Sequence, residues 1–116
     1  MLANEKKCEK NDSKACNANY EYLSTVEGNQ RDALVYAQKS CELRDYVGCF
    51  GAAFIYSKYM ANLDQAFEYF EKGLNLGYDN WAYLETETPL KLLKTDPRYI
   101  ELIQKYKRVK NDTSVR

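Results

Sequence analysis

Identical residues recur at one fixed interval along this chain, and this repetition constrains its fold more than any other sequence feature. The four cysteines form two C-x7-C pairs, and Cys41 and Cys49 follow Cys8 and Cys16 at the same distance. We call the step from Cys8 to Cys41 the repeat interval. Seven further identities recur at it: Glu9 with Glu42, Asp12 with Asp45, Asn29 with Asn62, Ala33 with Ala66, Tyr36 with Tyr69, Lys39 with Lys72 and Leu43 with Leu76. Fixed periods of about 20–50 residues are typical of arrays of stacked structural repeats.

Each period has the pattern of two helices. Residues 47–59 place small side chains beside bulky ones, as expected of a helix that packs closely against its neighbours. Residues 63–76 carry apolar side chains at helical spacing with charged side chains on the other face, and Gly77 follows where the helix should end. The preceding period repeats this arrangement over 14–25 and 31–43.

These patterns predict an all-α fold and a definite organisation of the chain. Residues 2–10 are similar to the end of one more second helix. We therefore expect a short α-solenoid of stacked antiparallel helix hairpins over 1–85. C-terminal capping helices are expected over 86–110, and a flexible tail over 111–116.

Each cysteine pair is expected to join the last turn of one helix to the first turn of the next. Four cysteines allow three connectivities, and the repeated spacing favours disulfides joining Cys8 to Cys16 and Cys41 to Cys49. Two alternatives stay open, namely a four-thiolate zinc site, for which this spacing is unusual, and four free thiols. Disulfides would imply an oxidising compartment. Because residues 1–12 are polar and contain no signal peptide, we expect the chain to be a mature form in which Met1 is a substitute start.

Composition excludes several classes of function. Lys plus Arg and Asp plus Glu both number 17, and this balance argues against nucleic-acid binding. No apolar run is long enough for membrane insertion. The absence of histidine removes Ser-His-Asp catalysis and HExxH zinc sites. The acid pair Glu68 and Glu71 lies on the polar face of a predicted helix, where solvated side chains are expected. Together with the lack of histidine, this predicts no catalytic residue, metal ligand or cofactor, and no enzymatic activity.

Three segments carry a resemblance to a known family. Residues 15–23 (ACNANYEYL) and 48–56 (GCFGAAFIY) resemble the first helix of Sel1-like and tetratricopeptide (TPR-like) repeats, and residues 64–76 (DQAFEYFEKGLNL) resemble the second. The placement of the cysteines is similar to that in cysteine-rich, secreted Sel1-like proteins of bacteria. The chain departs from the family pattern at Tyr20, where a small residue is usual, and in a shorter loop between the first and second helices.

The resemblance implies that ligands bind first-helix positions on the concave face of the array. The matching positions are Asn17, Glu21 and Ser24 in one repeat and Phe50, Phe54 and Ser57 in the next, and Lys58 adjoins the last of these. Tyr59, which lies in or near a loop, is also expected to face a partner. Because Phe50 and Phe54 are four residues apart on one helix, we expect them to form a single aromatic patch. The alternative is that both phenylalanines pack against the C-terminal helices.

The expected function is that of a non-enzymatic, protein-binding helical-repeat scaffold in the periplasm or outside the cell, which neutralises or docks a partner protein. One alternative is a periplasmic immunity protein that inhibits a cognate secreted, type VI-like toxin, a role that small Sel1-like proteins fill. A further alternative is a weak hydrolase acting on cell wall or β-lactams. Against it, Ser24, Ser40 and Ser57 have no histidine to activate them, and no SxxK motif occurs.

Overall fold

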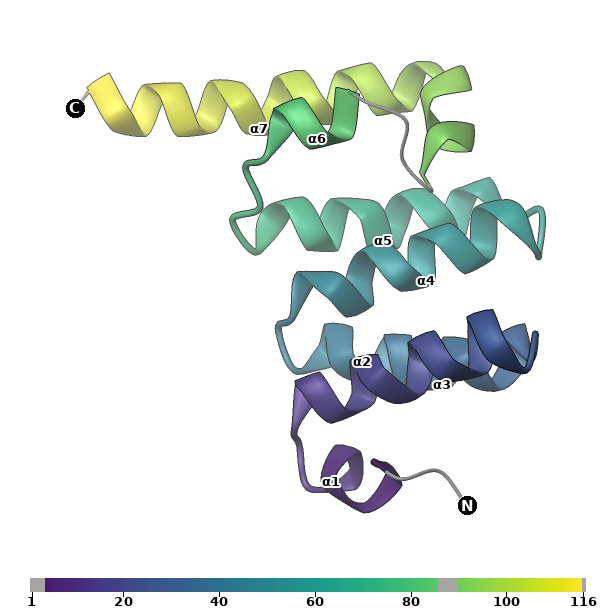
Figure 1. The fold of residues 1–116 in the computed structure, drawn as a ribbon. Coiled ribbons are helices and arrows are strands. Elements are labelled where there is room, and N and C mark those ends of the chain that lie inside the picture. Colours follow the sequence, from purple (N-terminus) through teal and green to yellow (C-terminus); the bar gives the residue numbers. More distant parts are fainter. Residues whose placement is uncertain (1–3, 86–89, 116) are drawn as a thin grey trace.

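The computed structural model describes residues 4–85 and 90–115, and every regular element in these ranges is helical (Figure 1). The prediction of an all-α fold is confirmed. In the first part of the chain the elements are α1 (Glu5–Glu9), α2 (Ser13–Glu21), a π-helical turn (Tyr22–Val26), α3 (Gln30–Glu42), α4 (Tyr46–Lys58) and α5 (Leu63–Asn75). They are followed by α6 (Trp81–Glu85), a 3₁₀ turn (Lys91–Thr95) and α7 (Pro97–Val115).

Helices that follow one another in sequence are neighbours in space. The pairs α1–α2, α2–α3, α3–α4 and α4–α5 pack together, and α7 packs on α5. The helices succeed one another along the longest dimension of a molecule of 48 × 31 × 21 Å, with α1 at one end and α7 at the other (Figure 1). Helices α2 and α4 also touch each other and lie nearer the viewer than α3 and α5, so they share one side of the molecule.

The same local backbone geometry recurs at the repeat interval. Asp12, Asn29, Asp45 and Asn62 each precede a helix, and their side chains accept hydrogen bonds from backbone N–H groups in its first turn. Such caps satisfy donors that the helix itself leaves unpaired. Because Asp45 follows Asp12, and Asn62 follows Asn29, at the repeat interval, the helix starts repeat with the sequence.

The turns between helices repeat in the same way. Asn11, Arg44 and Gly77 each follow the end of a helix and have φ angles of 71°, 67° and 102°. Gly28 and Ala61 have φ angles of 65° and 49° in the other set of turns. A left-handed residue commonly ends a helix, and glycine adopts this conformation with the least strain. The backbone conformation of the turns therefore recurs at the same interval as the sequence identities.

The buried core is larger toward the C-terminal end of the molecule. The largest cluster joins α4, α5 and the C-terminal elements and contains Ala53, Ala66, Phe67, Phe70, Leu74, Leu84, Leu90, Leu93 and Tyr99. A second cluster joins the π-helical turn, α3 and α4 and contains Leu23, Ala33, Leu34, Ala37, Ala52 and Ile55. The third contains Cys8, Ala15 and Cys16 alone, so the disulfide is itself most of the core around α1.

Helices α3 and α4 approach so closely at Gly48 that a side chain has no room. A Cβ added at Gly48 would lie 2.4 Å from the Ser40 Cβ and 2.6 Å from the Ala37 carbonyl oxygen. We expect Gly48→Ala to lower the free energy of unfolding by about 1–3 kcal/mol, because this overlap outweighs the better helix propensity of alanine. Urea denaturation measures the loss, with the exposed neighbour Val47→Ala as the control. A Gly48→Ala protein as stable as the native chain would show that the two helices separate at little cost.

The C-terminal boundaries differ from those predicted. The last helix continues through residues 111–115, where we expected a flexible tail, because no glycine or proline follows Pro97 to end it. The closing helices begin at Trp81 rather than at residue 86, since Asn80 caps the new helix by accepting a hydrogen bond from the Tyr83 N–H. Residues 86–89 of the predicted capping segment lie outside the described residues.

Candidate partner-binding face

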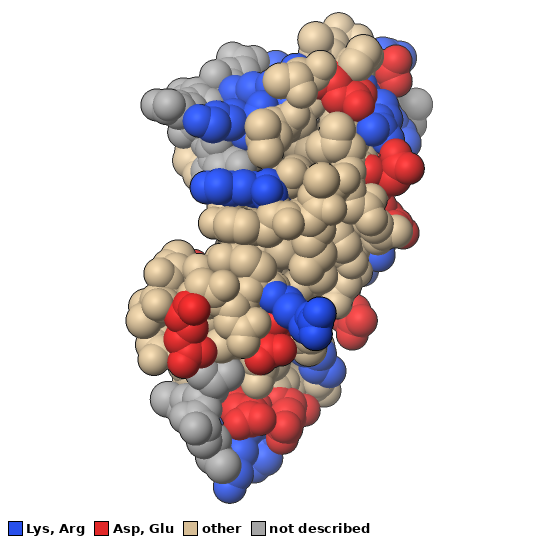
Figure 2. Space-filling model, turned by 90° about the vertical axis from the view of Figure 1, so that its right-hand side faces the viewer, with Lys and Arg blue, Asp and Glu red and all other residues tan. Residues whose placement is uncertain are grey.

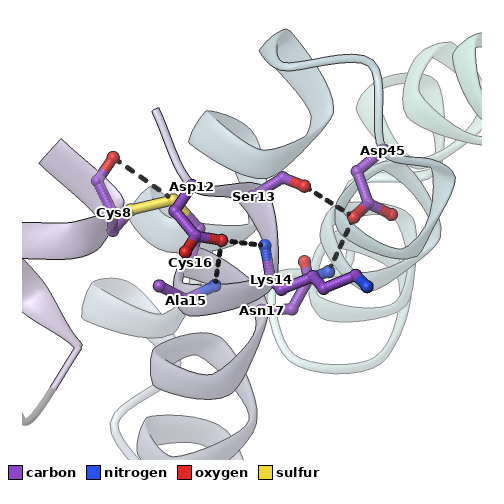
Figure 3. Close-up of a disulfide and its surroundings, with 8 residues drawn as sticks. All are labelled: Cys8, Asp12, Ser13, Lys14, Ala15, Cys16, Asn17 and Asp45. Carbon is purple, nitrogen blue, oxygen red and sulfur yellow. Dashed lines mark hydrogen bonds between the residues drawn. A yellow bond between two sulfur atoms is a disulfide. The ribbon is translucent and has the colours of Figure 1, made fainter. Parts of the chain in front are cut away.

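Both predicted cysteine pairs are present in the structure at disulfide distance. The Cα atoms are 4.7 Å apart between Cys8 and Cys16 and 4.6 Å apart between Cys41 and Cys49. Each pair joins the end of one helix to the first turn of the next (Figure 3 shows the first pair), and none of the four cysteines is left free. Two such pairs are consistent with an oxidising compartment. The residues that the structure describes include no group of three or more His, Cys, Asp or Glu side chains placed to hold a metal ion.

Asn17 is held within the fold rather than offered to a partner. Its Nδ2 donates to the Asp45 Oδ2 at 3.0 Å, and the Ser13 hydroxyl donates to the same oxygen at 2.9 Å (Figure 3). The other Asp45 oxygen accepts from the Val47 N–H at the start of α4. One carboxylate therefore ties the start of α2 to the start of α4, so Asn17 is a structural residue.

Ser24 and Phe50 are also engaged inside the molecule. The buried Ser24 hydroxyl donates to the Gln30 Oε1 at 2.7 Å, which fastens the turn after α2 to the start of α3. The Phe50 ring lies 5.7 Å from the Phe70 ring and 4.9 Å from the Tyr78 ring, between α4 and α5. Phe50 and Phe54 are both partly buried against the cluster that includes residues of the C-terminal helices, which agrees with the alternative expected for the two phenylalanines.

Phe54 and Phe50 both pack against the largest core cluster, but their rings contact different aromatic partners. The half-buried Phe54 ring makes an edge-to-face contact with Tyr59 at 5.7 Å. The Lys58 Nζ lies 5.5 Å from the Phe54 ring centroid and 5.4 Å from that of Tyr59, within the range of a cation–π interaction. Tyr59 is 47% exposed. We call Phe54, Lys58 and Tyr59 the Lys58 cluster.

Tyr20 lies beside this cluster and was not predicted as a site residue. A Cβ at Gly51 would lie 2.7 Å from its ring, so the glycine on α4 makes room for the tyrosine on α2. Burial raises the pKa of Tyr20 to about 12, with smaller contributions from the charges of Glu21 and Tyr59, so the hydroxyl stays protonated at neutral pH. A large residue at position 20, where the resembling repeats have a small one, together with a glycine at position 51, could have indicated this contact from the sequence.

The structure thus brings together part of the predicted set and adds one residue to it. We define the α2–α4 face as Tyr20, Glu21, Phe54, Lys58 and Tyr59. Glu21 is exposed on it and supplies a carboxylate, while the cluster supplies two rings and a cation. Figure 2 shows a largely uncharged band across the middle of the molecule, at the level of α4 and α5. The face offers apolar area bordered by single charges of each sign, which suits recognition of a polypeptide surface.

Comparison with protein-family models, with curated proteins and with solved structures finds no match for this chain. None of the helices in the described ranges is both long enough and apolar enough to pass through a lipid bilayer.

Proposed function

We propose that this chain is a non-enzymatic scaffold that binds another protein, built as a short Sel1-like or TPR-like solenoid and working in the periplasm or outside the cell. Two observations support the repeat architecture: helix caps and left-handed turns recur at the repeat interval, and the helices from α1 to α5 each pack on the next one. The disulfide pairs support the compartment, because they persist where the surroundings are oxidising. The partner binds the α2–α4 face.

The Lys58 cluster is the observation that carries this assignment. Two aromatic rings and a lysine lie together at the end of α4, and Tyr59 keeps nearly half of its surface open to solvent. Rigid aromatic side chains are frequent energetic centres of protein interfaces, because they bury much apolar area with few torsions to fix. The matching partner segment carries an apolar side chain for the rings and a carboxylate for Lys58.

The hydrolase alternative is disfavoured by the surroundings of its candidate nucleophiles. Ser24, Ser40 and Ser57 are all buried. The Ser24 hydroxyl donates to Gln30, and the Ser57 hydroxyl donates to the Phe54 carbonyl oxygen at 3.1 Å in its own helix. A serine nucleophile needs a base within hydrogen-bond reach and access to substrate, and these two hydroxyls are committed to structural contacts.

Replacing the exposed part of the cluster tests the proposed function. We expect the double variant Lys58→Ala/Tyr59→Ala to weaken binding by at least about tenfold, because it removes a central aromatic anchor and the charge beside it. The immobilised protein is incubated with the secreted fraction of its source cells. Bound proteins are quantified by mass spectrometry, and the affinity of the recovered partner is then measured by calorimetry.

The matched control is Val26→Ala, which changes an exposed apolar residue outside the face and should leave binding unchanged. Near-ultraviolet circular dichroism establishes that the variants keep the native packing. Equal affinity of the double variant and the native chain for the recovered partner would place the binding surface elsewhere and remove the α2–α4 face from the proposal.

A further inference from the structure

The turn between α1 and α2 carries an exposed asparagine that the fold itself does not require. Asn11 follows α1 with a φ angle of 71°, and its backbone N–H donates to the Cys8 carbonyl oxygen at 2.9 Å. Its side chain is exposed and makes no hydrogen bond to any described residue. Arg44 takes the equivalent position in the next layer with a φ angle of 67°, so this kind of turn does not need an asparagine.

The residues of this turn match a known modification pattern. Asn11 and Ser13 define an Asn-X-Ser sequence, the pattern of N-linked glycosylation acceptors, which lie on the surface of secreted proteins. The equivalent positions in the next layer hold Arg44 and Tyr46, whereas the aspartate between them caps the following helix in both layers. The acceptor pattern is therefore not a by-product of the repeated helix cap.

An exposed carboxylate distinguishes this acceptor from the other Asn-X-Ser/Thr sequence of the chain. Glu9 is exposed and lies two positions before Asn11. The other sequence occupies residues 111–113 within α7, and Val109 takes the place two positions before its asparagine. A carboxylate beside the acceptor can pair with a cation of an enzyme, and such charge-assisted contacts are stronger than neutral ones. Position 11 therefore offers an enzyme more to bind than position 111 does.

A sugar on Asn11 would lie away from the α2–α4 face. Ser13 begins α2 and Glu21 ends it, which separates the two ends of the helix by about 12 Å at about 1.5 Å per residue. Figure 1 shows the α1–α2 turn and the C-terminal end of α4, which Tyr59 caps, on opposite sides of the molecule. The modified chain therefore keeps that face open to its partner.

We propose that Asn11 is an N-linked glycosylation site, modified by an oligosaccharyltransferase from a lipid diphosphate-linked oligosaccharide. The Asn11 Nδ2 forms a bond to the anomeric carbon of the sugar, and the bond between that carbon and the phosphate oxygen breaks. The lipid diphosphate leaves with the electron pair, and one amide proton passes to a base of the enzyme. The proposal rests on the oxidising compartment of the proposed function and not on its partner or its binding face.

Transfer takes place before this segment folds. In the folded chain the Ser13 hydroxyl donates to the Asp45 Oδ2 at 2.9 Å, and Cys8 is joined to Cys16 across the turn. An enzyme that binds the amide and the hydroxyl of the acceptor together needs both to be free. The acceptor is therefore the chain before the disulfide closes and α4 packs on α2. Once attached, the sugar stays in solvent because Asn11 is exposed.

Intact mass of the native chain purified from its source cells tests the modification. We expect a mass that exceeds that of the sequence by one oligosaccharide, and fragmentation should place the sugar on Asn11. Asn11→Gln should have the bare mass, whereas the matched control Asn111→Gln should keep the sugar. A bare native chain, or a sugar attached only at residue 111, would overturn the proposal.

Further variants test how the acceptor is recognised. Ser13→Thr keeps the hydroxyl and should stay modified, whereas Ser13→Ala should lose the sugar. Glu9→Gln should lower the modified fraction by at least about tenfold, because a charge-assisted contact is lost. The control Glu42→Gln changes the exposed carboxylate at the equivalent place of the next layer and should be modified normally. Full modification of Ser13→Ala would overturn the assignment, and full modification of Glu9→Gln would remove the carboxylate from it.

Transfer in vitro tests the order of events. Membranes from the source cells supply the enzyme and the lipid-linked oligosaccharide, and the acceptor is either the reduced, unfolded chain or the oxidised, folded chain. We expect the reduced chain to be modified at least about tenfold faster, because the folded segment must first open. Equal rates would overturn the proposed order.

Reduction of the purified chain separates this result from the proposed function. A chain without sugar that takes up four hydrogens on reduction contains both disulfides, so only the glycosylation is overturned. A chain without sugar that takes up none contains free thiols, so the proposed compartment fails as well. Asn11→Gln should bind the recovered partner with native affinity, because it lies outside the α2–α4 face.

Discussion

Replacing all four cysteines by serine is expected to lower the free energy of unfolding by about 5 kcal/mol. Each disulfide closes a loop with a sequence separation of 8, and closing a loop of this size in the unfolded chain is worth about 2–3 kcal/mol in the chain-entropy model. A small domain has only about 5–15 kcal/mol in total. Urea denaturation of the native and all-serine proteins measures the difference.

The two pairs can be separated by double variants. Cys41→Ser/Cys49→Ser should affect the whole transition, because this pair joins α3 to α4 in the middle of the molecule. Cys8→Ser/Cys16→Ser should mainly release α1, whose core is little more than that disulfide. Intact mass before and after reduction is the control, since two disulfides take up four hydrogens. Native stability in the all-serine protein would mean that the disulfides contribute nothing.

The second large effect is expected at Phe70. We expect Phe70→Ala to lower the free energy of unfolding by about 3–5 kcal/mol, because it leaves a cavity in the largest cluster of the core. The Phe70 ring is fully buried and lies 5.4 Å from the Tyr99 ring of α7 and 5.7 Å from the Phe50 ring of α4. One side chain on α5 therefore connects three helices.

Thermal and urea denaturation measure this loss, with Val26→Ala as the control for an exposed apolar residue. The control should change stability by less than about 0.5 kcal/mol. If Phe70→Ala also lost less than about 1 kcal/mol, the C-terminal helices would be packing on α5 without depending on this ring.

Much of the fold follows from the sequence, because the residues that set the helix boundaries lie close to them in the chain and recur at the repeat interval. The helices predicted over 31–43, 47–59 and 63–76 are found at Gln30–Glu42, Tyr46–Lys58 and Leu63–Asn75. Caps and turn residues fix such boundaries through neighbours only two or three positions away. Residues 111–115 were expected to form a tail because chain ends commonly fray, whereas α7 extends to Val115 with no glycine or proline after Pro97 to end it.

The candidate site follows from the sequence only in part, because it depends on contacts between distant residues. Asn17 was expected at the surface, but the carboxylate that binds it is Asp45, which reaches it from another helix. Phe50 and Phe54 share a helix and are both half-buried, yet Tyr78 contacts the Phe50 ring whereas Tyr59 contacts the Phe54 ring. Helical spacing predicts on which face of its own helix a side chain lies. It does not predict which residues of the neighbouring helices cover that side chain.

The uneven core has a consequence for how the molecule opens. Most buried aromatic rings lie between α4, α5 and α7. The C-terminal half is therefore stabilised by more buried apolar contacts than the first two helices are. Where layers touch only their neighbours, thermal opening begins at the weakest one and advances inward. Opening should therefore begin with α1 and α2, which the disulfide between Cys8 and Cys16 keeps joined to each other, and advance toward α4, where the disulfide between Cys41 and Cys49 holds α3 to α4.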